Sequence, residues 1–317
     1  MVEGALRVIY FGTPAFAVPT LRALLASRHQ VVALVSQPDR PSGRGQHVAP
    51  TPTKQVALEA GVPILQPLKL RDEAFLSTIA SYNADLGVVA AYGRILPDPL
   101  LQLPRLGMIN VHGSLLPKYR GAAPVHRAVI AGEELTGVTI MQVVAALDAG
   151  PILATATRPI SADDTSVDVE RDLADIGARA LVEVVDKLSR GPVIETPQDD
   201  ALATYAPKLE KIESAIDWGL SAREIHNRVR GLQPWPMAST TIGGVRHVIH
   251  RTRTTDQMSP AGPGTVIEAA GDVLAVVAGD RKVLHILQIQ SEGRRVMTTR
   301  EFLNGRKLGV GVVLGTP

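Results

Sequence analysis

Three polar residues, an amide, an imidazole and a carboxylate, define the chemistry that this sequence could perform. Asn110 and His112 lie two positions apart at the end of an apolar run, and Asp148 stands before a turn of Ala, Gly and Pro. Asn110 can donate a hydrogen bond to an oxygen that becomes negative, and His112 can exchange a proton. Asp148 can orient that imidazole or stabilise its charge. The set predicts acyl transfer that needs neither a metal nor a covalent nucleophile.

The spacing of Asn110 and His112 is that of residues on one face of an extended strand. Val111 between them would then point to the core. Parallel sheets bind their ligands at the carboxyl ends of their strands. We therefore expect both polar side chains to face one crevice at such an end.

Short apolar runs alternate with helical stretches through residues 6–188. We expect strands at 6–11, 31–35, 86–90, 108–111, 136–144 and 152–160, and helices at 53–60, 72–81 and 166–188. Thr13 would be the N-cap of a further helix after the first strand, with Pro14 as the first helical residue. This alternation predicts an α/β fold, with a mostly parallel sheet and helices on both faces.

The last third of the chain has a different pattern. Residues 191–207 are rich in Pro, Asp and Thr, which indicates a linker. Ser221 and Glu224 then form a capping-box pattern for a helix that Gly231 would end. Strand-like runs separated by Gly-Gly and Gly-Asp turns follow. We expect a small β-rich domain, either a barrel of the oligonucleotide-binding (OB) kind or a sandwich.

The composition limits the classes of chemistry. The chain has 317 residues, 45% apolar and 20% charged, which is typical of a folded protein with two domains. It has no cysteine, which excludes disulfides, thiolate nucleophiles, iron–sulfur clusters and cysteine-based zinc sites. We therefore expect no metal and a reducing, cytoplasmic location. A basic leader and any apolar run of about eighteen residues are missing, so we expect no membrane partner.

Basic residues gather in the last part of the chain. The net charge is +2, but residues from Pro207 onward include fifteen Lys and Arg against ten Asp and Glu. Residues 1–206 have the opposite balance, with eighteen basic and twenty-one acidic residues. Lys and Arg clusters gain affinity for polyanions by releasing phosphate counterions, so this part is expected to bind a nucleic acid. A basic surface that is merely solvated is the alternative.

Two motifs resemble the signature of the folate-dependent formyltransferases. They are residues 110–121 and the segment Leu147-Asp148-Ala149-Gly150-Pro151. Three further segments, 11–14, 37–45 and 205–208, narrow the resemblance to the branch that formylates methionyl initiator tRNA. The resemblance extends from the first strand to about Trp218 and is weaker beyond it. It implies a Rossmann-like catalytic domain at 1–190, a linker at 191–207 and an OB-like, tRNA-binding barrel at 208–317.

The resemblance also implies a reaction. A formyl group would pass from the co-substrate 10-formyltetrahydrofolate to the α-amino group of methionyl initiator tRNA, for translation initiation. The amine would attack directly, and Asn110 and His112 would stabilise the tetrahedral intermediate while Asp148 assists proton transfer. We expect the protein to act as a monomer.

Residues for the two substrates follow from the same resemblance. Those matched to the folate site are Arg94, Ile95, Leu96, Ser114, Leu115, Leu116 and Pro117. Those matched to the tRNA site are Arg40, Arg44, Lys208 and Lys211. Arg40 and Arg44 lie in a Pro- and Gly-rich segment, which predicts a flexible loop that becomes ordered on nucleic acid. Gln46 and His47 stand where relatives often have lysines, so fewer loop contacts to phosphate are expected.

Other functions share parts of this pattern. A nucleotide-amino-sugar formyltransferase can share the three site residues and the two-domain plan, but the arginine-rich loop and the basic tail argue against it. A glycinamide ribonucleotide transformylase needs backbone N–H groups where Pro14 has none, and a formyltetrahydrofolate hydrolase needs no polyanion site. A non-catalytic RNA-binding protein is disfavoured because only 3% of the residues are aromatic. A dinucleotide-dependent oxidoreductase is disfavoured because no G-x-G-x-x-G follows the first strand.

Overall fold

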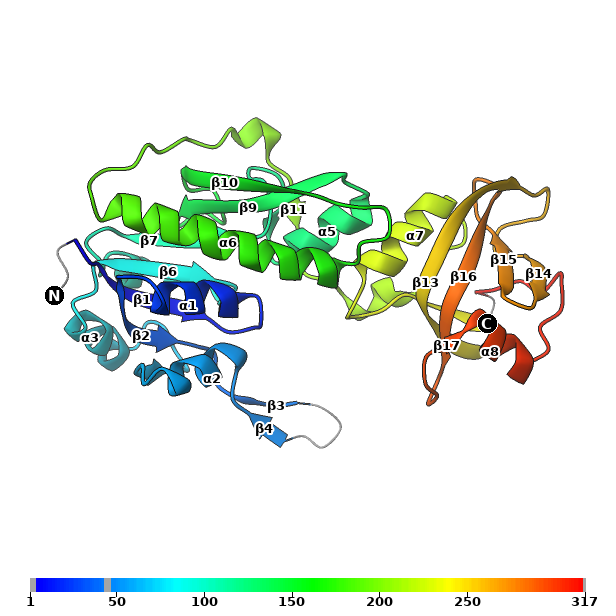
Figure 1. Ribbon diagram of the computed structural model, residues 1–317, viewed down its shortest axis with the longest axis horizontal. Helices are drawn as coiled ribbons and strands as arrows, with labels where there is room; N and C mark the ends of the chain where they lie inside the picture. The colour runs from blue at the N-terminus through cyan, green and yellow to red at the C-terminus, as the bar shows by residue number, and fades with distance from the viewer. Residues whose placement is uncertain (1–3, 43–46, 316–317) are drawn as a thin grey trace. The chain divides into compact units, whose positions relative to one another are not determined.

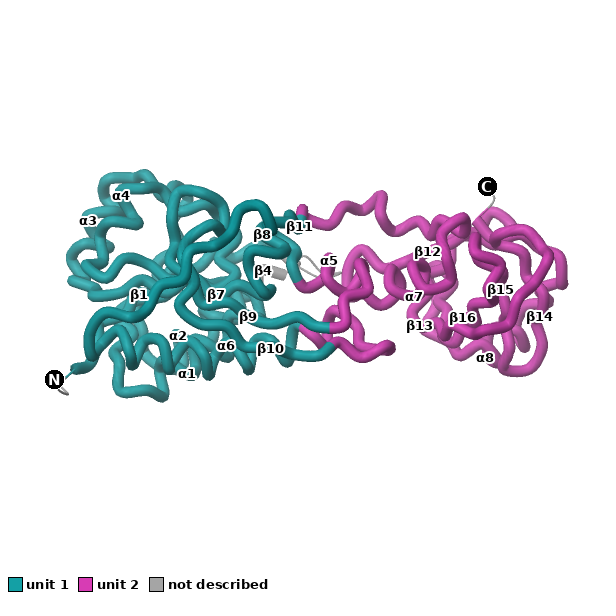
Figure 2. The backbone as a smooth tube through the Cα atoms, turned by 90° about the horizontal axis from the view of Figure 1, so that it is seen from above, with its two compact units in different colours: residues 1–124, 135–159, 170–206 teal, residues 125–134, 160–169, 207–317 magenta. Residues whose placement is uncertain are grey.

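The computed structural model describes residues 4–42 and 47–315 of the chain (Figure 1). The chain divides into two compact units, each built from three segments of the sequence (Figure 2). Unit 1 comprises residues 1–124, 135–159 and 170–206, and unit 2 comprises residues 125–134, 160–169 and 207–317. The expected domains were continuous stretches joined by a linker, whereas the observed units are interleaved along the sequence.

Unit 1 is built on a seven-stranded sheet with the strand order β10-β9-β7-β6-β1-β2-β5. Its strands are β1 (Arg7–Gly12), β2 (Gln30–Val35), β5 (Ile64–Leu65), β6 (Leu86–Ala90), β7 (Met108–His112), β9 (Leu135–Gln142) and β10 (Ile152–Pro159). Neighbouring strands from β5 to β7 are parallel, and β9 runs against both of its neighbours. Every residue of β6 is buried, as expected of a central strand covered on both faces. The predicted mostly parallel sheet is confirmed.

Helices cover both faces of this sheet (Figure 1). They are α1 (Ala17–Leu25), α2 (Pro52–Glu59), α3 (Glu73–Ser81), α4 (Asp98–Leu101) and α6 (Ser166–Leu188), whose first four residues belong to unit 2. On one face, Phe75 of α3 and Leu100 of α4 pack in a core with Phe11. On the other face, a methyl group added to Gly177 of α6 would come within 2.9 Å of Val111 in β7. The strand that carries Asn110 and His112 is therefore supported closely from behind.

The first helix begins later than the sequence predicts. Its first residue is Ala17, after the N-cap Phe16. The Thr13 hydroxyl, expected as the N-cap, instead accepts a hydrogen bond of 3.2 Å from the backbone N–H of Gln37 after β2. Pro14 precedes the helix in a turn, where its carbonyl accepts the Ala17 N–H at 3.0 Å. The predicted cap is wrong because a residue distant in sequence occupies the hydroxyl.

The expected linker is largely hydrogen-bonded to the rest of unit 1. Thr196 and Ile152 exchange two backbone hydrogen bonds of 2.8 and 2.9 Å. At the other end, β11 (Tyr205–Ala206) pairs in parallel with β8 (Arg120–Gly121). We call residues 196–206 the strap, because both of its ends are tied to the sheet unit. A Pro-rich composition did not reveal these bonds, since they are made by the backbone.

Unit 2 contains a six-stranded sheet in which the pairings are antiparallel. Its elements are β12 (Ser239–Ile242), β13 (Val245–Met258), β14 (Val266–Ala270), β15 (Val273–Val277), β16 (Lys282–Ser291) and β17 (Met297–Thr298), with helices α5 (Pro124–Ala131), α7 (Ala222–Gly231) and α8 (Thr299–Gly305). This arrangement is consistent with the expected small barrel. Across the described part of both units, no helix has the length and apolar character that a membrane span needs.

Capping boxes begin the α-helices α7 and α8 of unit 2. The predicted box is present in α7, where Ser221 accepts the Glu224 backbone N–H and Glu224 returns a bond to Ser221. The helix ends at Gly231, as expected. A second box, between Thr298 and Glu301, begins α8, which was not predicted. The same sequence signal, a Thr followed three positions later by Glu, was available there.

Candidate active site

Strand β7 places Asn110 and His112 on one face of the sheet of unit 1. Val111 between them is 2% exposed and lies on the opposite face, against α6. His112 ends the strand and is buried, with 5% of its surface exposed, whereas Asn110 is half-buried. The alternation of side chains along a strand therefore brings the amide and the imidazole together, as the sequence predicts.

The two ring nitrogens of His112 have different partners. Nε2 lies 2.9 Å from the backbone carbonyl oxygen of Tyr119, which can only accept, so Nε2 carries the proton of this contact. Nδ1 lies 3.7 Å from Oδ2 of Asp148, an ion-pair distance that is longer than a hydrogen bond. Nδ1 is therefore the nitrogen that can take up a proton. The resulting imidazolium would lie beside a carboxylate.

Asp148 lies in the turn between β9 and β10, with a left-handed backbone at φ +48°. Its Oδ2 accepts a hydrogen bond of 2.8 Å from the backbone N–H of Gly121. The same oxygen is the one that approaches His112. One carboxylate oxygen thus connects the imidazole and the loop after β7 to the turn after β9, which lies 27 residues beyond Gly121 in the sequence.

The Asn110 side chain has no hydrogen bond to another residue within the described ranges 4–42 and 47–315. Its amide N–H is thus available to an oxygen atom of a substrate, on the same face as the imidazole. An amide donor, an imidazole with a free ring nitrogen and a neighbouring carboxylate are the groups that a reaction through a negatively charged oxygen requires.

Two backbone groups of the site were not predicted from the sequence. They are the Tyr119 carbonyl, which binds His112, and the Gly121 N–H, which binds Asp148. Both residues have positive φ, +62° for Tyr119 and +120° for Gly121. The glycine is a signal for such a turn, but the sequence does not reveal which side chains its backbone groups face.

The first loop matched to the folate site combines exposed and internal residues. Ile95 is 81% exposed. The Arg94 guanidinium donates to the backbone carbonyls of Pro67 and Leu68, at 3.2 and 2.9 Å. Leu96 is buried in the core beneath the loop. The loop therefore presents one apolar side chain and one fixed guanidinium at the surface.

The second loop matched to the folate site, after β7, is mostly held by internal bonds. Ser114 is fully buried and its hydroxyl donates to a backbone carbonyl of the same loop at 2.7 Å. Leu116 is buried, and its backbone N–H donates to a threonine hydroxyl of β9 at 3.1 Å. Leu115 and Pro117 are half-buried. The Ser114 hydroxyl and the Leu116 backbone thus hold the loop, and Leu115 and Pro117 are the two of these four residues with exposed surface.

The residues matched to tRNA lie in both units. Arg40 is exposed at the start of β3 (Arg40–Ser42), which pairs in antiparallel fashion with β4 (His47–Ala49). Arg44 lies outside the described residues. Lys208 and Lys211 are exposed in unit 2. The segment expected as a flexible loop is thus in part a two-stranded hairpin, because its flanks form a backbone ladder.

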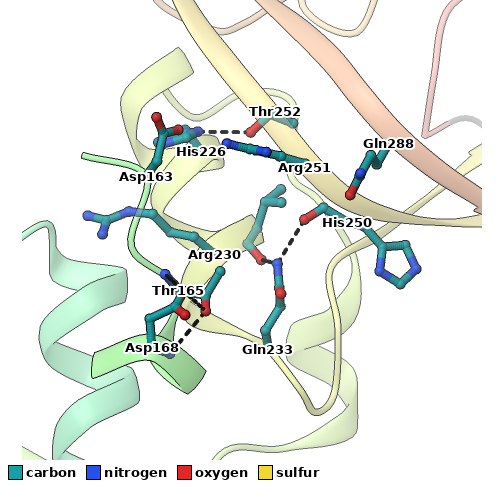
Figure 3. Close-up of a pocket in the computed structure, with 11 residues that line it drawn as sticks. Asp163, Thr165, Asp168, His226, Arg230, Gln233, His250, Arg251, Thr252 and Gln288 are labelled. Atoms are coloured by element: carbon teal, nitrogen blue, oxygen red, sulfur yellow. Dashed lines mark hydrogen bonds between the residues drawn. The ribbon is translucent and has the colours of Figure 1, made fainter. Parts of the chain in front are cut away.

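A polar cavity of about 290 Å³ lies within unit 2, lined by α7, β13, β16 and the segment 160–169 (Figure 3). Arg230 is 6% exposed, and its guanidinium donates to Asn227 Oδ1 and to the Asp164 backbone carbonyl. His226 meets the Thr252 hydroxyl at 3.0 Å on Nδ1 and the Ala162 carbonyl at 2.9 Å on Nε2. Both side chains therefore hold the segment 160–169 against α7.

Half-buried His226 and fully buried His247 give the protein a pH dependence of stability. Burial lowers the pKa of His226, and burial together with the positive charge of Arg306 lowers the pKa of His247, both from an ordinary value of 6.5. Because the folded-state pKa is depressed, the unfolded chain binds protons first as the pH falls. The contribution of these histidines to the free energy of unfolding is therefore fully present above a pH of about 6.5 and is lost as the pH falls below it.

We expect the free energy of unfolding in urea to decrease between about pH 7 and pH 5.5, by roughly 1.4 kcal/mol per pH unit at most for each such histidine. This window lies above the ordinary pKa of Asp and Glu. His226→Gln, which keeps a donor near the Ala162 carbonyl but does not titrate, should show a shallower decrease. A stability that is constant or rises toward pH 5.5 would contradict this expectation.

Comparison with known proteins places the chain in a family. The profile described as Formyl transferase matches residues 6–185, and the profile described as Formyl transferase, C-terminal domain, matches residues 208–307. The methionyl-tRNA formyltransferase of Desulfotalea psychrophila is 46% identical over 314 residues, which cover 99% of this chain and 97% of that protein. The methionyl-tRNA formyltransferase of Pseudoalteromonas translucida is 44% identical and covers 98% of both chains.

Solved structures of lower identity share the fold. WlaRD, a sugar 3N-formyl transferase solved in the presence of dTDP and 5-N-formyl-THF, has a TM-score of 0.66 at 16% identity and covers 92% of this chain and 99% of that chain. HypX from Aquifex aeolicus, in complex with tetrahydrofolic acid, has a TM-score of 0.63 at 17% identity, and the match covers 96% of this chain but only 48% of HypX. From the profiles and the full-length relatives, the chain belongs to the formyl transferase family and, within it, to the methionyl-tRNA formyltransferases.

Proposed function

We propose that this protein transfers the formyl group of 10-formyltetrahydrofolate to the α-amino group of methionyl initiator tRNA, for translation initiation. The observation that carries the proposal is the identity of 43–46% to methionyl-tRNA formyltransferases over 98–99% of the chain. Similarity of this extent includes both the unit that contains Asn110, His112 and Asp148 and the basic carboxyl-terminal part.

The exposed residues of the first folate loop suit the chemistry of the donor. Folate combines flat rings with an acidic tail. Ile95 offers an exposed apolar side chain beside Arg94, whose guanidinium is fixed by two carbonyls. Apolar contact for a ring and a positive charge for a carboxylate match the two parts of that molecule. Leu96 supports the loop from the core, and Leu115 and Pro117 offer further apolar surface.

The acceptor needs little activation, because α-amino groups have a pKa of about 7.7–8.0 and a fair share is neutral near pH 7. Asn110 donates to the formyl oxygen as that oxygen becomes negative. His112 takes the proton of the attacking amine on Nδ1, and Asp148 at 3.7 Å stabilises the imidazolium. Once protonated, Nδ1 can also donate to the negative oxygen, because Nε2 is already bound to Tyr119. His112 then donates this proton to N10 of the folate as the bond between N10 and the formyl carbon breaks.

The tRNA site of the proposal consists of Arg40, Arg44, Lys208 and Lys211. Exposed Lys and Arg side chains bind phosphate without reading the bases, so they fix the position of the acceptor rather than its identity. The surplus of basic over acidic residues after Pro207 supports a polyanionic partner for the carboxyl-terminal part. We further propose that the protein acts as a monomer in the cytoplasm, where aminoacyl-tRNA is consumed by translation.

A comparison of acceptors tests the proposed function. The protein is incubated with 10-formyltetrahydrofolate labelled in the formyl group and with methionyl initiator tRNA, a nucleotide amino sugar or water alone. We expect label in the tRNA that carries methionine and none in the same tRNA without its amino acid, which lacks the amine. Transfer to the sugar at a comparable rate would instead indicate a nucleotide-amino-sugar formyltransferase. Release of labelled formate at a comparable rate would indicate a formyltetrahydrofolate hydrolase.

A further inference from the structure

Gln198 is the residue through which the strap contacts the turn that contains Asp148. In residues 191–200, Gln198 and Val193 are half-buried while the other eight residues are exposed. The Gln198 side chain contacts both loops that form the site. It therefore has a different environment from the surface residues around it.

Gln198 makes four hydrogen bonds, which use the full capacity of an amide. Its Nε2 donates to the backbone carbonyls of Asp148 at 2.8 Å and Gly150 at 2.7 Å. Its Oε1 accepts from Nε and Nη2 of Arg120 at 3.1 and 2.8 Å. Because carbonyls only accept and guanidinium groups only donate, both sides require the same orientation of the amide.

Arg120 connects this amide to the loop after β7. The residue is 4% exposed, and its guanidinium also forms an ion pair with Asp200 of the strap, at 2.7 Å. The next residue, Gly121, donates its backbone N–H to the Asp148 carboxylate. Gln198 thus closes a ring of contacts that runs from the Asp148 backbone through Arg120 and Gly121 to the Asp148 side chain.

The turn at Asp148 depends on such support. The three residues before it, Ala145, Ala146 and Leu147, are exposed, and the Asp148 backbone is left-handed at φ +48°, which is uncommon for a residue with a side chain. The carboxylate must nevertheless stay beside Nδ1 of His112 for the proton transfer proposed above. Displacements of about 1 Å at a reacting group can cost a hundredfold in rate.

We propose that Gln198 is a positioning residue for formyl transfer, which acts by fixing the Asp148 turn against the loop after β7. This inference rests on the proposed function. The strap lies between the segments that the two family profiles match, which end at residue 185 and begin again at residue 208. We call the set of bonds from Gln198 to Arg120, Asp148 and Gly150 the clamp. Through the clamp, the strap holds two loops of the site together and is more than a spacer between domains.

Gln198→Glu tests this role with a side chain of the same size. The carboxylate still accepts from Arg120, but it repels the Asp148 and Gly150 carbonyls instead of donating to them. We expect kcat to fall about tenfold to a hundredfold with little change in either KM, because only the positioning of Asp148 changes. Gln198→Met, which keeps the length without a donor, should give a loss in the same range. Asp199→Asn changes the charge of the adjacent residue, keeps its cap to Ala201, and should retain full turnover.

A double-mutant cycle separates positioning from a general loss of structure. Asp148→Asn should lower kcat by itself, and in that background Gln198→Glu should have little further effect, because its target is already inactive. If the loss of kcat in the double variant equals the product of the two single losses, or if Gln198→Glu keeps full turnover, the clamp is overturned. The role of Asp148 stays intact in both cases. Full turnover in Asp148→Asn would overturn both the role of Asp148 and the clamp. Transfer to another acceptor by the unaltered protein would instead overturn the proposed function alone.

Discussion

His112→Ala and Asn110→Ala should each lower kcat for formyl transfer about a hundredfold to a thousandfold, the usual loss for one donor to a developing oxyanion. His112→Ala removes the ring nitrogen that faces Asp148 at 3.7 Å. Asn110→Ala removes an amide that has no other partner among the described residues, so little else is lost with it. Single-turnover rates with labelled donor and methionyl initiator tRNA measure the effect.

Stability must be followed together with these rates. Asn110 is half-buried, and its replacement should leave the urea unfolding curve nearly unchanged. His112 is buried and its replacement removes the hydrogen bond to the Tyr119 carbonyl, so a moderate loss of stability is expected there. Asn304→Ala, at an exposed position of α8, is a matched control that should keep both stability and rate. Near-normal turnover in a folded Asn110→Ala or His112→Ala protein would remove that residue from the mechanism.

Gly150→Ala should damage both stability and turnover, although it adds a single methyl group. An added Cβ would lie 1.9 Å from the backbone carbonyl oxygen of Gln142, where neither backbone segment can yield cheaply. Overpacking of this kind costs about 1–3 kcal/mol. The Gly150 carbonyl also accepts the Gln198 amide, and Asp148 is two residues away. A displaced turn should therefore reduce kcat about tenfold to a hundredfold as well.

The matched control for this substitution is Gly262→Ala. A Cβ at Gly262 would meet no heavy atom within 4 Å, so its unfolding midpoint and its turnover should stay close to those of the original protein. If Gly150→Ala unfolds at the same urea concentration as Gly262→Ala, the backbone around the turn is free to move. The support proposed for Asp148 would then be wrong as well.

Local signals predicted much of the architecture because they act over short distances. The strand at 86–90 and the helix at 166–188 have the expected bounds, since each has a clear apolar pattern. The helix after Ser221 begins and ends where its capping residues indicate. The pairing of Asn110 and His112 on one face follows from the two-residue period of a strand.

Features that depend on distant residues were not predictable in the same way. The N-cap expected at Thr13 fails because Gln37 binds its hydroxyl. His112 contacts the Tyr119 carbonyl, and Gln198 contacts the Asp148 carbonyl. In both cases the fold brings a side chain to a backbone group that the sequence pattern does not identify. Residues 191–207 have the composition of a linker, yet β11 within them pairs with β8 and Thr196 forms a β-bridge with Ile152. Composition indicates the local conformation that a segment favours, but it does not reveal which other segments its backbone will pair with.

The interleaving of the two units decides how this protein can be dissected. A fragment that starts at residue 207 contains α7 but lacks the segment 160–169. His226 would lose the Ala162 carbonyl, and Arg230 would lose the Asp164 carbonyl that helps to solvate its buried charge. Truncated proteins and chimeras that contain only residues 207–317 of this chain would therefore lack part of the hydrogen bonding and packing of unit 2. A chimera should instead exchange all three segments of unit 2 together, because these contacts are then kept within the transplanted unit.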